Sequence, residues 1–305
     1  MFKIFIAGLT ALTVFIGSVT VDAARYFMQG DAKGSSTPYG DNLKVGKYAQ
    51  TDDAKIYYEV YGKGDPILIL HGGGVGSPYE LGKIIDNLKK NHKVILMSTR
   101  GHGRSEIGNS QMTYKQKADD AVAVLDSVGE KSVKILGFSD GAYTAYEIAA
   151  LYPEKVERIV SIGAGTLEKN FFGNEMKLSD LEKFDAEFIA EQKKIRPEPE
   201  RWQEFCNNYI NFWHNMSVGE ETFGKIKCPV LLVVGDEDDH APVITVLAAH
   251  QMLENSRLAV IPKAWHSAFL DNYDATAEVI FPFLNADVKN LQSSKKVEYN
   301  NKAIF

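Results

Sequence analysis

Short apolar runs alternate with longer helical patterns over most of the chain, which restricts it to a small set of folds. Such alternation is typical of a mostly parallel β-sheet with helices packed on both faces. The run at residues 66–70 is apolar throughout instead of alternating, as expected of a strand buried on both sides. The sequence therefore predicts a doubly wound α/β sheet. We expect strands at residues 54–61, 66–70, 93–98, 132–137, 156–162, 228–234 and 257–261, and helices at residues 79–90, 114–128, 140–152, 242–254 and 274–284.

One segment interrupts this alternation. Residues 166–224 show helical periods and concentrate aromatic side chains, which predicts a helical cap inserted into a core of residues 44–165 and 225–285. The aromatic side chains have two interpretations, either packing of the cap's own helices or a lid whose inner face lines an apolar pocket. Residues 24–43 are polar and contain glycine, so we expect a linker or extended arm, and residues 286–305 form a polar tail.

The first 23 residues have the pattern of a secretory signal peptide. Lys3 precedes an apolar run, and the compact residues Val21 and Ala23 predict cleavage after Ala23. We expect the mature protein to be soluble and exported, either to a periplasm or to the extracellular space. The alternative is an N-terminal membrane anchor, because about 18 apolar residues are just enough to span a bilayer core.

Composition excludes several kinds of partner. The chain carries 34 Lys and Arg against 40 Asp and Glu, a net charge of −6, so no broad positive field exists to attract nucleic acid. The two cysteines, Cys206 and Cys228, lack the ligand spacings of a structural zinc site. Export would permit them to pair, but they fall in different predicted layers and their approach cannot be inferred from sequence.

The strongest chemical signal is a serine between two glycines at residues 137–141, directly after a predicted strand and at the start of a predicted helix. This is the G-x-S-x-G nucleophile elbow in its required strand–turn–helix setting. Ser139 would occupy the sharp turn, while Gly137 and Gly141 would omit Cβ atoms that collide with the neighbouring strand and helix. A glycine-rich loop at residues 71–74 follows another buried strand. We expect the backbone N–H groups of Gly73 and Asp140 to form an oxyanion hole.

A serine hydroxyl needs a base oriented by a carboxylate, and both must lie further along the chain. His266 follows the strand expected at residues 257–261, so it would lie at the same edge of the sheet as Ser139. The acid should follow the strand at residues 228–234, where we choose Asp238, with Asp236 and Asp239 as alternatives. The resulting chain order of serine, aspartate and histidine differs from that of the other serine-hydrolase folds.

These segments together resemble the α/β-hydrolase superfamily over residues 44–285. The resemblance rests on His71-Gly-Gly, on the Gly-His-Gly-Arg-Ser run after Arg100, on the elbow, on Tyr152-Pro153 and on Gly235-x-x-Asp238. It implies that the acid is the aspartate of G-x-x-D, which favours Asp238. The chain departs from the family pattern at Trp265 and Ala142, where glycines are common, and this affects the expected shape of the pocket.

The elbow is similar to that of valacyclovir-hydrolase-like enzymes. In those enzymes the aspartate after the nucleophile recognises a substrate ammonium, so the resemblance implies that Asp140 confers a preference for amino-acid esters. We also name His71, Gly72 and Trp265 as candidate substrate-binding residues.

The sequence thus predicts a serine hydrolase that cleaves a small-molecule ester or lactone through an acyl-enzyme, without metal or organic cofactor. C–C bond or amide hydrolysis on the same triad remains open, because one fold supports many reactions. A non-catalytic binding protein that keeps the hydrolase fold, and a structural exported protein attached through its arm, are the alternatives from other classes. The sequence does not indicate the oligomeric state.

Overall fold

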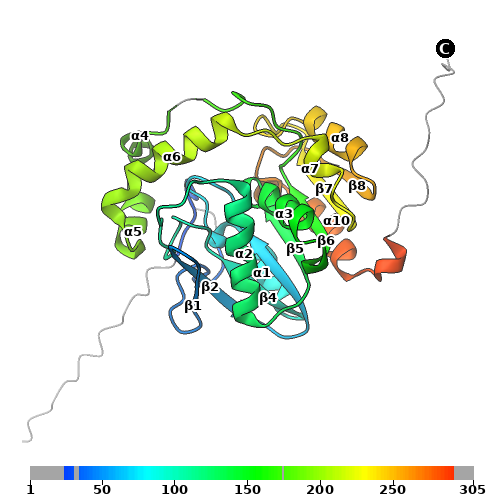
Figure 1. Cartoon of the computed structure of the whole chain (residues 1–305), viewed down its shortest axis with the longest axis horizontal. Helices are drawn as coiled ribbons and strands as arrows, with labels where there is room; N and C mark the ends of the chain where they lie inside the picture. The colour runs from blue at the N-terminus through cyan, green and yellow to red at the C-terminus, as the bar shows by residue number, and fades with distance from the viewer. Residues whose placement is uncertain (1–23, 31–33, 174, 292–305) are drawn as a thin grey trace, which may run out of the picture.

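The computed structural model describes residues 24–30, 34–173 and 175–291, and its core is an eight-stranded sheet (Figure 1). The signal peptide predicted at residues 1–23 and most of the predicted tail lie outside the described residues. Within the described residues, no helix is both long enough and apolar enough to cross a membrane. The strands are β1 (Lys47–Gln50), β2 (Lys55–Tyr61), β3 (Asp65–Leu70), β4 (His92–Met97), β5 (Val133–Phe138), β6 (Val156–Ile162), β7 (Val230–Gly235) and β8 (Ser256–Ile261).

The sheet is mostly parallel, which confirms the predicted fold class. Its strand order is β1-β2-β4-β3-β5-β6-β7-β8. At one edge β2 pairs antiparallel with both β1 and β4, and strands β3 to β8 are all parallel to one another. In β3, Ile67 and Ile69 pack into the core layer on one face, and Leu68 and Leu70 pack into the layer on the other. Burial on both faces explains why this strand is apolar throughout.

Helices cover both faces of the sheet. One layer contains α2 (Tyr114–Val128), α3 (Asp140–Leu151) and α8 (Val243–Met252), and the other contains α1 (Gly82–Leu88) and α10 (Tyr273–Asn285). The capping residues of α2 show why this helix begins and ends where it does. Thr113 accepts a hydrogen bond from the N–H of Gln116 at its start, and Gly129 at its end has a φ of 80°.

Three elements differ from the sequence prediction, one of them the short helix α9 (Ala268–Asp271), which the sequence did not predict. The helix expected at residues 79–90 is a 3₁₀ turn, η1 (Pro78–Leu81), followed by the shorter α1. The edge strand β1 was not predicted, because its four residues Lys-Tyr-Ala-Gln carry little apolar periodicity. Its position depends on antiparallel pairing with β2.

The predicted cap is helical and lies above the carboxyl edge of the sheet (Figure 1). Its helices are α4 (Leu178–Phe184), α5 (Ala186–Ile195), α6 (Trp202–Asn215) and α7 (Glu220–Phe223). Phe188, Trp202, Phe205 and Tyr209 form a separate buried cluster, so these cap aromatics pack the cap itself. Cys206 belongs to this cluster, Cys228 precedes β7, and both thiols are free.

The described parts of the predicted arm, residues 24–43, lack helix and strand but pack against the body of the protein. Glu59 of β2 is fully buried and accepts hydrogen bonds from the N–H groups of Gly40 and Asn42, at 3.0 and 2.7 Å. Tyr39 is buried as well. The segment is therefore held by a buried carboxylate of another element, which its own sequence cannot reveal.

Candidate active site

Ser139 occupies a strained turn at the carboxyl end of β5. Its φ and ψ are 51° and −118°, a backbone conformation that residues other than glycine rarely adopt. A Cβ on Gly137 would lie 2.5 Å from the carbonyl oxygen of Gly141, and one on Gly141 would lie 2.3 Å from that of Leu70. The two glycines therefore permit the close approach of strand and helix on which the turn depends.

The structure joins Ser139, His266 and Asp238 in one hydrogen-bonded row. His266 Nε2 lies 2.8 Å from Ser139 Oγ, and His266 Nδ1 lies 3.0 and 2.9 Å from the two carboxylate oxygens of Asp238. An ionised carboxylate can only accept, so Nδ1 carries the proton and Nε2 is free to accept the serine proton. Gly163, at the end of β6, makes room for this histidine, because a Cβ there would lie 2.9 Å from His266 Cε1.

Asp238 is held in its charged form. Burial by itself raises the pKa of this carboxyl, but hydrogen bonds from His266 and from the N–H groups of Ala241 and His240 outweigh burial and lower the pKa. The two alternative acids, Asp236 and Asp239, form hydrogen bonds with other groups. Asp236 accepts a hydrogen bond from the N–H of Ala264, and Asp239 contacts the ring of His240.

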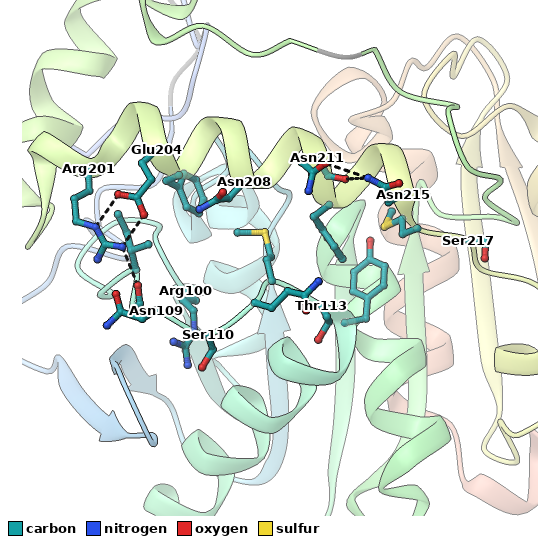
Figure 2. Close-up of a pocket in the computed structure, with 18 residues that line it drawn as sticks. Arg100, Asn109, Ser110, Thr113, Arg201, Glu204, Asn208, Asn211, Asn215 and Ser217 are labelled. Atoms are coloured by element: carbon teal, nitrogen blue, oxygen red, sulfur yellow. Dashed lines mark hydrogen bonds and ion pairs between the residues drawn. The ribbon is translucent and has the colours of Figure 1, made fainter.

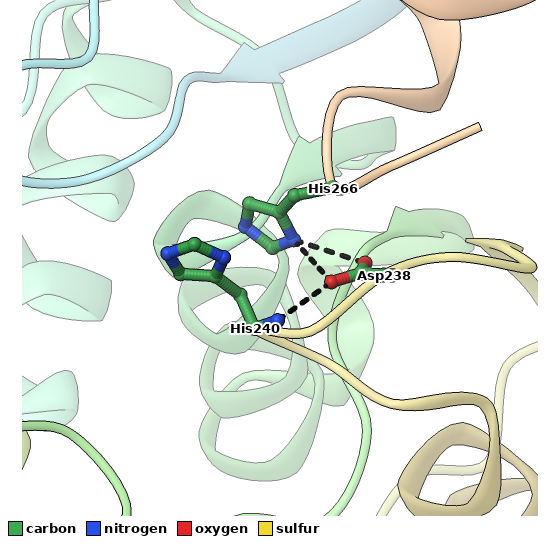
Figure 3. Close-up of side chains that lie close together, drawn as sticks. All are labelled: Asp238, His240 and His266. Carbon is green, nitrogen blue, oxygen red and sulfur yellow. Dashed lines mark hydrogen bonds and ion pairs between the residues drawn. The ribbon is translucent and has the colours of Figure 1, made fainter.

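His240 stacks on His266, a contact that the sequence did not reveal (Figure 3). The ring centroids are 4.7 Å apart with an interplanar angle of 25°. Potential ligand atoms of Asp238, His240 and His266 lie within 4.8 Å of one another, which could suggest a metal site. However, the ring lone pairs lie in nearly parallel planes and do not converge on one point, and His266 Nδ1 is already bonded to Asp238. The arrangement fits an oriented base better than a metal site.

His71 lies behind the glycine-rich loop, which corrects the expectation that it contacts substrate. It is fully buried, its Nδ1 contacts the carbonyl of Gly72 at 2.6 Å, and its Nε2 accepts from the N–H of Thr99 at 3.0 Å. Burial lowers the pKa of His71 to about 4, so the ring is neutral at pH 7. His71 packs behind the glycine-rich loop and supports it from the interior. Gly72 and Trp265, the other candidate substrate-binding residues, do line the cavity described below.

Asp140 is already neutralised from within the protein. Its side chain is 1% exposed, and Oδ2 lies 2.5 Å from Lys117 Nζ and 2.6 Å from the hydroxyl of Tyr209. Trp213 Nε1 donates to Oδ1 at 3.3 Å, as does the hydroxyl of Tyr114. This carboxylate therefore has an internal cation and no free face, which argues against the implied recognition of a substrate ammonium.

A cavity of about 770 Å³ opens above Ser139 and His266. The glycine-rich loop, Trp265 and the cap side chains Phe172, Met176 and Trp213 contribute to its lining. Residues 26–28 line it too, a contribution that the sequence did not predict. The two interpretations of the cap aromatics are thus both correct, for different residues.

A second cavity of about 560 Å³ lies between α6 and residues 107–113 (Figure 2). None of the residues that line it belongs to the hydrogen-bonded row at Ser139. Some of its polar side chains bond to one another, as Arg201 does with Glu204 and Asn215 with Asn211. This cavity is separate from the candidate active site.

Comparison with known proteins agrees with the fold. Residues 65–190 match the family model of the alpha/beta hydrolase fold. The human serine hydrolase BPHL is 25% identical over 80% of this chain and 89% of its own length. The 2-hydroxy-6-oxo-6-phenylhexa-2,4-dienoate hydrolase of Comamonas testosteroni is 24% identical over 80% of this chain and 97% of its own length.

A solved meta-cleavage product hydrolase from Pseudomonas fluorescens shares the fold. It superposes with a TM-score of 0.63 and 19% identity, covering 80% of this chain and 99% of that one. Sheet topology, family match and relatives lead to one conclusion: the chain has the alpha/beta hydrolase fold, and it is similar to hydrolases of that family.

Proposed function

We propose that this protein is a serine hydrolase that cleaves an uncharged ester or lactone of a small molecule through an acyl-enzyme. The observation that carries the proposal is the hydrogen-bonded row of Ser139, His266 and Asp238, of which Ser139 and His266 line the 770 Å³ cavity. Nucleophile, base and orienting acid are thereby within hydrogen-bond reach of one another, as nucleophilic catalysis requires.

The reaction follows from this arrangement. Ser139 Oγ attacks the carbonyl carbon while its proton passes to His266 Nε2, and Asp238 stabilises the resulting imidazolium. The proton then goes to the departing alkoxide as the carbon–oxygen bond breaks, leaving an acylated serine. Water attacks the acyl-enzyme in the second half, with His266 as base again, and releases the acid. Each step uses groups that the chain itself supplies.

The N–H groups of Gly73 and Asp140 are the proposed oxyanion donors. The two residues are adjacent, since a Cβ on Gly73 would lie 2.9 Å from Asp140 Cβ. Asp140 is the first residue of α3, where a backbone N–H has no partner within the helix. The carboxylate of Glu80 accepts from the N–H of Gly72 at 2.7 Å and thereby holds the loop in place. Removal of one such donor typically costs about 10²–10³ in rate.

Charge around the cavity favours an uncharged substrate. Among the described residues that line it, four are acidic and none is Lys or Arg. The acidic residues are Glu80, Glu175, Asp239 and Asp271. Burial raises the pKa of Glu80 to about 8, so near pH 7 an anionic substrate would meet like charge at Glu175, Asp239 and Asp271. C–C cleavage of a dienoate, the substrate class named for the Comamonas relative, is therefore less compatible with this cavity than ester or lactone cleavage.

The test compares substrates of similar size with purified protein. We expect p-nitrophenyl butyrate to be cleaved at least about tenfold faster, in kcat/KM, than the anionic p-nitrophenyl hemisuccinate. A butyryl p-nitroanilide and the dienoate of the Comamonas enzyme serve as amide and C–C probes, and γ-butyrolactone serves as a lactone. Ser139→Ala should lower kcat by about 10⁴-fold or more. Faster cleavage of the dienoate or the amide, or no turnover of any probe by folded protein, would contradict the proposal.

A further inference from the structure

One wall of the active-site cavity belongs neither to the sheet nor to the cap. Tyr26, Phe27 and Met28 line the cavity together with Ser139 and His266. They belong to the N-terminal segment of residues 24–30, which lies upstream of the region that matches the family model. Tyr26 and Phe27 are half-buried, whereas Met28 is 63% exposed. Tyr26 and Phe27 thus form the less solvent-exposed part of this wall.

The N-terminal segment is tied to the cap by ion pairs of Arg25 with the exposed Glu187 and with the buried Asp185. Asp185 Oδ2 accepts from Arg25 at 3.0 Å and from the N–H of Met28 at 2.8 Å. The side chain of Asp185 is 7% exposed and also caps α5, where Oδ1 accepts from the N–H of Phe188 at 3.0 Å. An ion pair in so little solvent holds its partners more firmly than one at the surface.

Ring packing reinforces this attachment. The ring of Phe27 meets that of Phe188 edge to face, with centroids 5.6 Å apart. Phe188 is 1% exposed within the buried cluster of the cap. In Figure 1, α5 lies at the end of the cap remote from α7, beyond which the chain re-enters the sheet. The N-terminal segment therefore supports the cap at the end that its own chain connections do not reach.

The other side of the segment is fixed to the core. Ala24 and Tyr26 pack on the core layer that contains Tyr79, and the Tyr26 and Tyr79 rings lie 6.4 Å apart. Tyr79 is buried, and its hydroxyl donates to the carbonyl of Ser35 at 2.6 Å. The segment is thus attached to both the core and the cap.

We propose that residues 24–30 determine the acyl-chain preference of this site, with Phe27 as the principal specificity-determining residue. A short acyl group reaches only the elbow and the glycine-rich loop, whereas a longer chain extends to the aromatic wall and buries apolar surface there. Apolar contact of this kind contributes about 0.8 kcal/mol for each buried methylene group. The inference relies on the proposed function only in taking an uncharged ester as the ligand.

The experiment measures binding in a Ser139→Ala background, so that esters stay intact. Trp213 and Trp265 line the cavity, so binding of p-nitrophenyl acetate and p-nitrophenyl hexanoate can be followed by quenching of tryptophan fluorescence. Phe27→Ala should weaken hexanoate binding by about tenfold and change acetate binding less than about threefold. Phe27→Leu, which keeps most of the apolar volume, should restore most of the hexanoate affinity.

Two further variants separate the wall from general damage. Phe184→Ala is the matched control, because Phe184 is 68% exposed in the cap and does not line the cavity. It should leave the hexanoate-to-acetate ratio unchanged. Asp185→Asn keeps a good helix cap but removes the buried carboxylate partner of Arg25 and leaves it only the exposed Glu187, so it should shift the ratio in the same direction as Phe27→Ala.

The outcomes distinguish this inference from the proposed function. A hexanoate-to-acetate ratio that stays within twofold of the parent in Phe27→Ala would overturn the inference, whether or not the wild type turns over esters. Equal shifts in Phe27→Ala and Phe184→Ala would also overturn it. Failure of the wild type to cleave any ester would overturn the proposed function, while the binding ratio would still decide whether the wall selects chain length.

Discussion

Breaking the buried ion pair between Lys117 and Asp140 should destabilise the protein strongly. The two side chains are 3% and 1% exposed, and the ammonium lies 2.5 Å from the carboxylate. Lys117→Met would leave that carboxylate buried without a cation. Removal of one partner from a buried pair typically costs about 3–5 kcal/mol, whereas replacement of both by neutral groups costs far less. We therefore expect Lys117→Met to lower the free energy of unfolding by about 3–5 kcal/mol.

A double-mutant cycle measures this coupling. Asp140→Asn keeps the shape, and its one amide oxygen can still accept from either Tyr209 or Trp213, so the double variant should regain most of the loss caused by Lys117→Met. Lys115→Met is the control on the same helix, because Lys115 forms only an exposed pair with Asp119 and its loss should leave the urea midpoint unchanged. The assay is urea unfolding at pH 7, with comparison of m-values.

Two results would refute this reasoning. One is a Lys117→Met variant within about 1 kcal/mol of the wild type, which would mean that water or another group solvates the Asp140 carboxylate. The other is a double variant no more stable than Lys117→Met alone, which would place the cost in lost packing of the lysine stem and not in the uncompensated charge.

Three other outcomes follow from the site. Because Lys117 neutralises Asp140, an α-amino ester should be hydrolysed no faster than its deaminated analogue; a clear preference for the amino ester in kcat/KM would contradict this. Burial raises the pKa of Glu80 to about 8, so folding disfavours its ionised form and stability declines as pH rises from about 4.5 to 8. The free energy of unfolding of Glu80→Gln should thus equal that of the wild type near pH 4 and exceed it by about 2 kcal/mol near pH 8, as measured by thermal or urea unfolding. This value takes into account that solvent reaches the cavity and weakens the cost of the charge. Equal stability of variant and wild type at both pH values would argue against a buried charge at Glu80. Gly163→Ala should lower kcat by about 10²-fold, because Gly163 has a φ of 66° and the added methyl displaces His266; unchanged turnover would show that the histidine can shift without loss.

The parts of this structure that sequence predicts well are those that depend on local periodicity. The strand at β3 is apolar on both faces, and the glycines beside Ser139 carry a steric requirement that their spacing already expresses. The order of strands and helices also brings the loop after β8 to the same edge as the elbow. The sequence therefore placed Ser139, Asp238 and His266 correctly at one edge of the sheet.

The parts that it misses depend on contacts between distant segments. Lys117 meets Asp140 only because α2 packs against α3 beneath the cap, and no spacing along the chain encodes that distance. The N-terminal segment has no periodicity, and its place in the cavity depends on Asp185 of the cap. His71 shows the opposite error. The family pattern includes His71 with the glycine-rich loop, but only the fold shows that this ring is buried in the interior.

The most direct test of the account is whether Ser139 is an activated nucleophile. Purified protein is incubated with a fluorophosphonate and its intact mass is measured, with Ser139→Ala alongside and circular dichroism as a check of folding. The account predicts one adduct on the wild type, strongly slowed labelling in His266→Ala, and no adduct on Ser139→Ala. A folded wild type that stays unlabelled, or an adduct that persists in Ser139→Ala, would contradict the assignment of Ser139, His266 and Asp238 as the catalytic machinery.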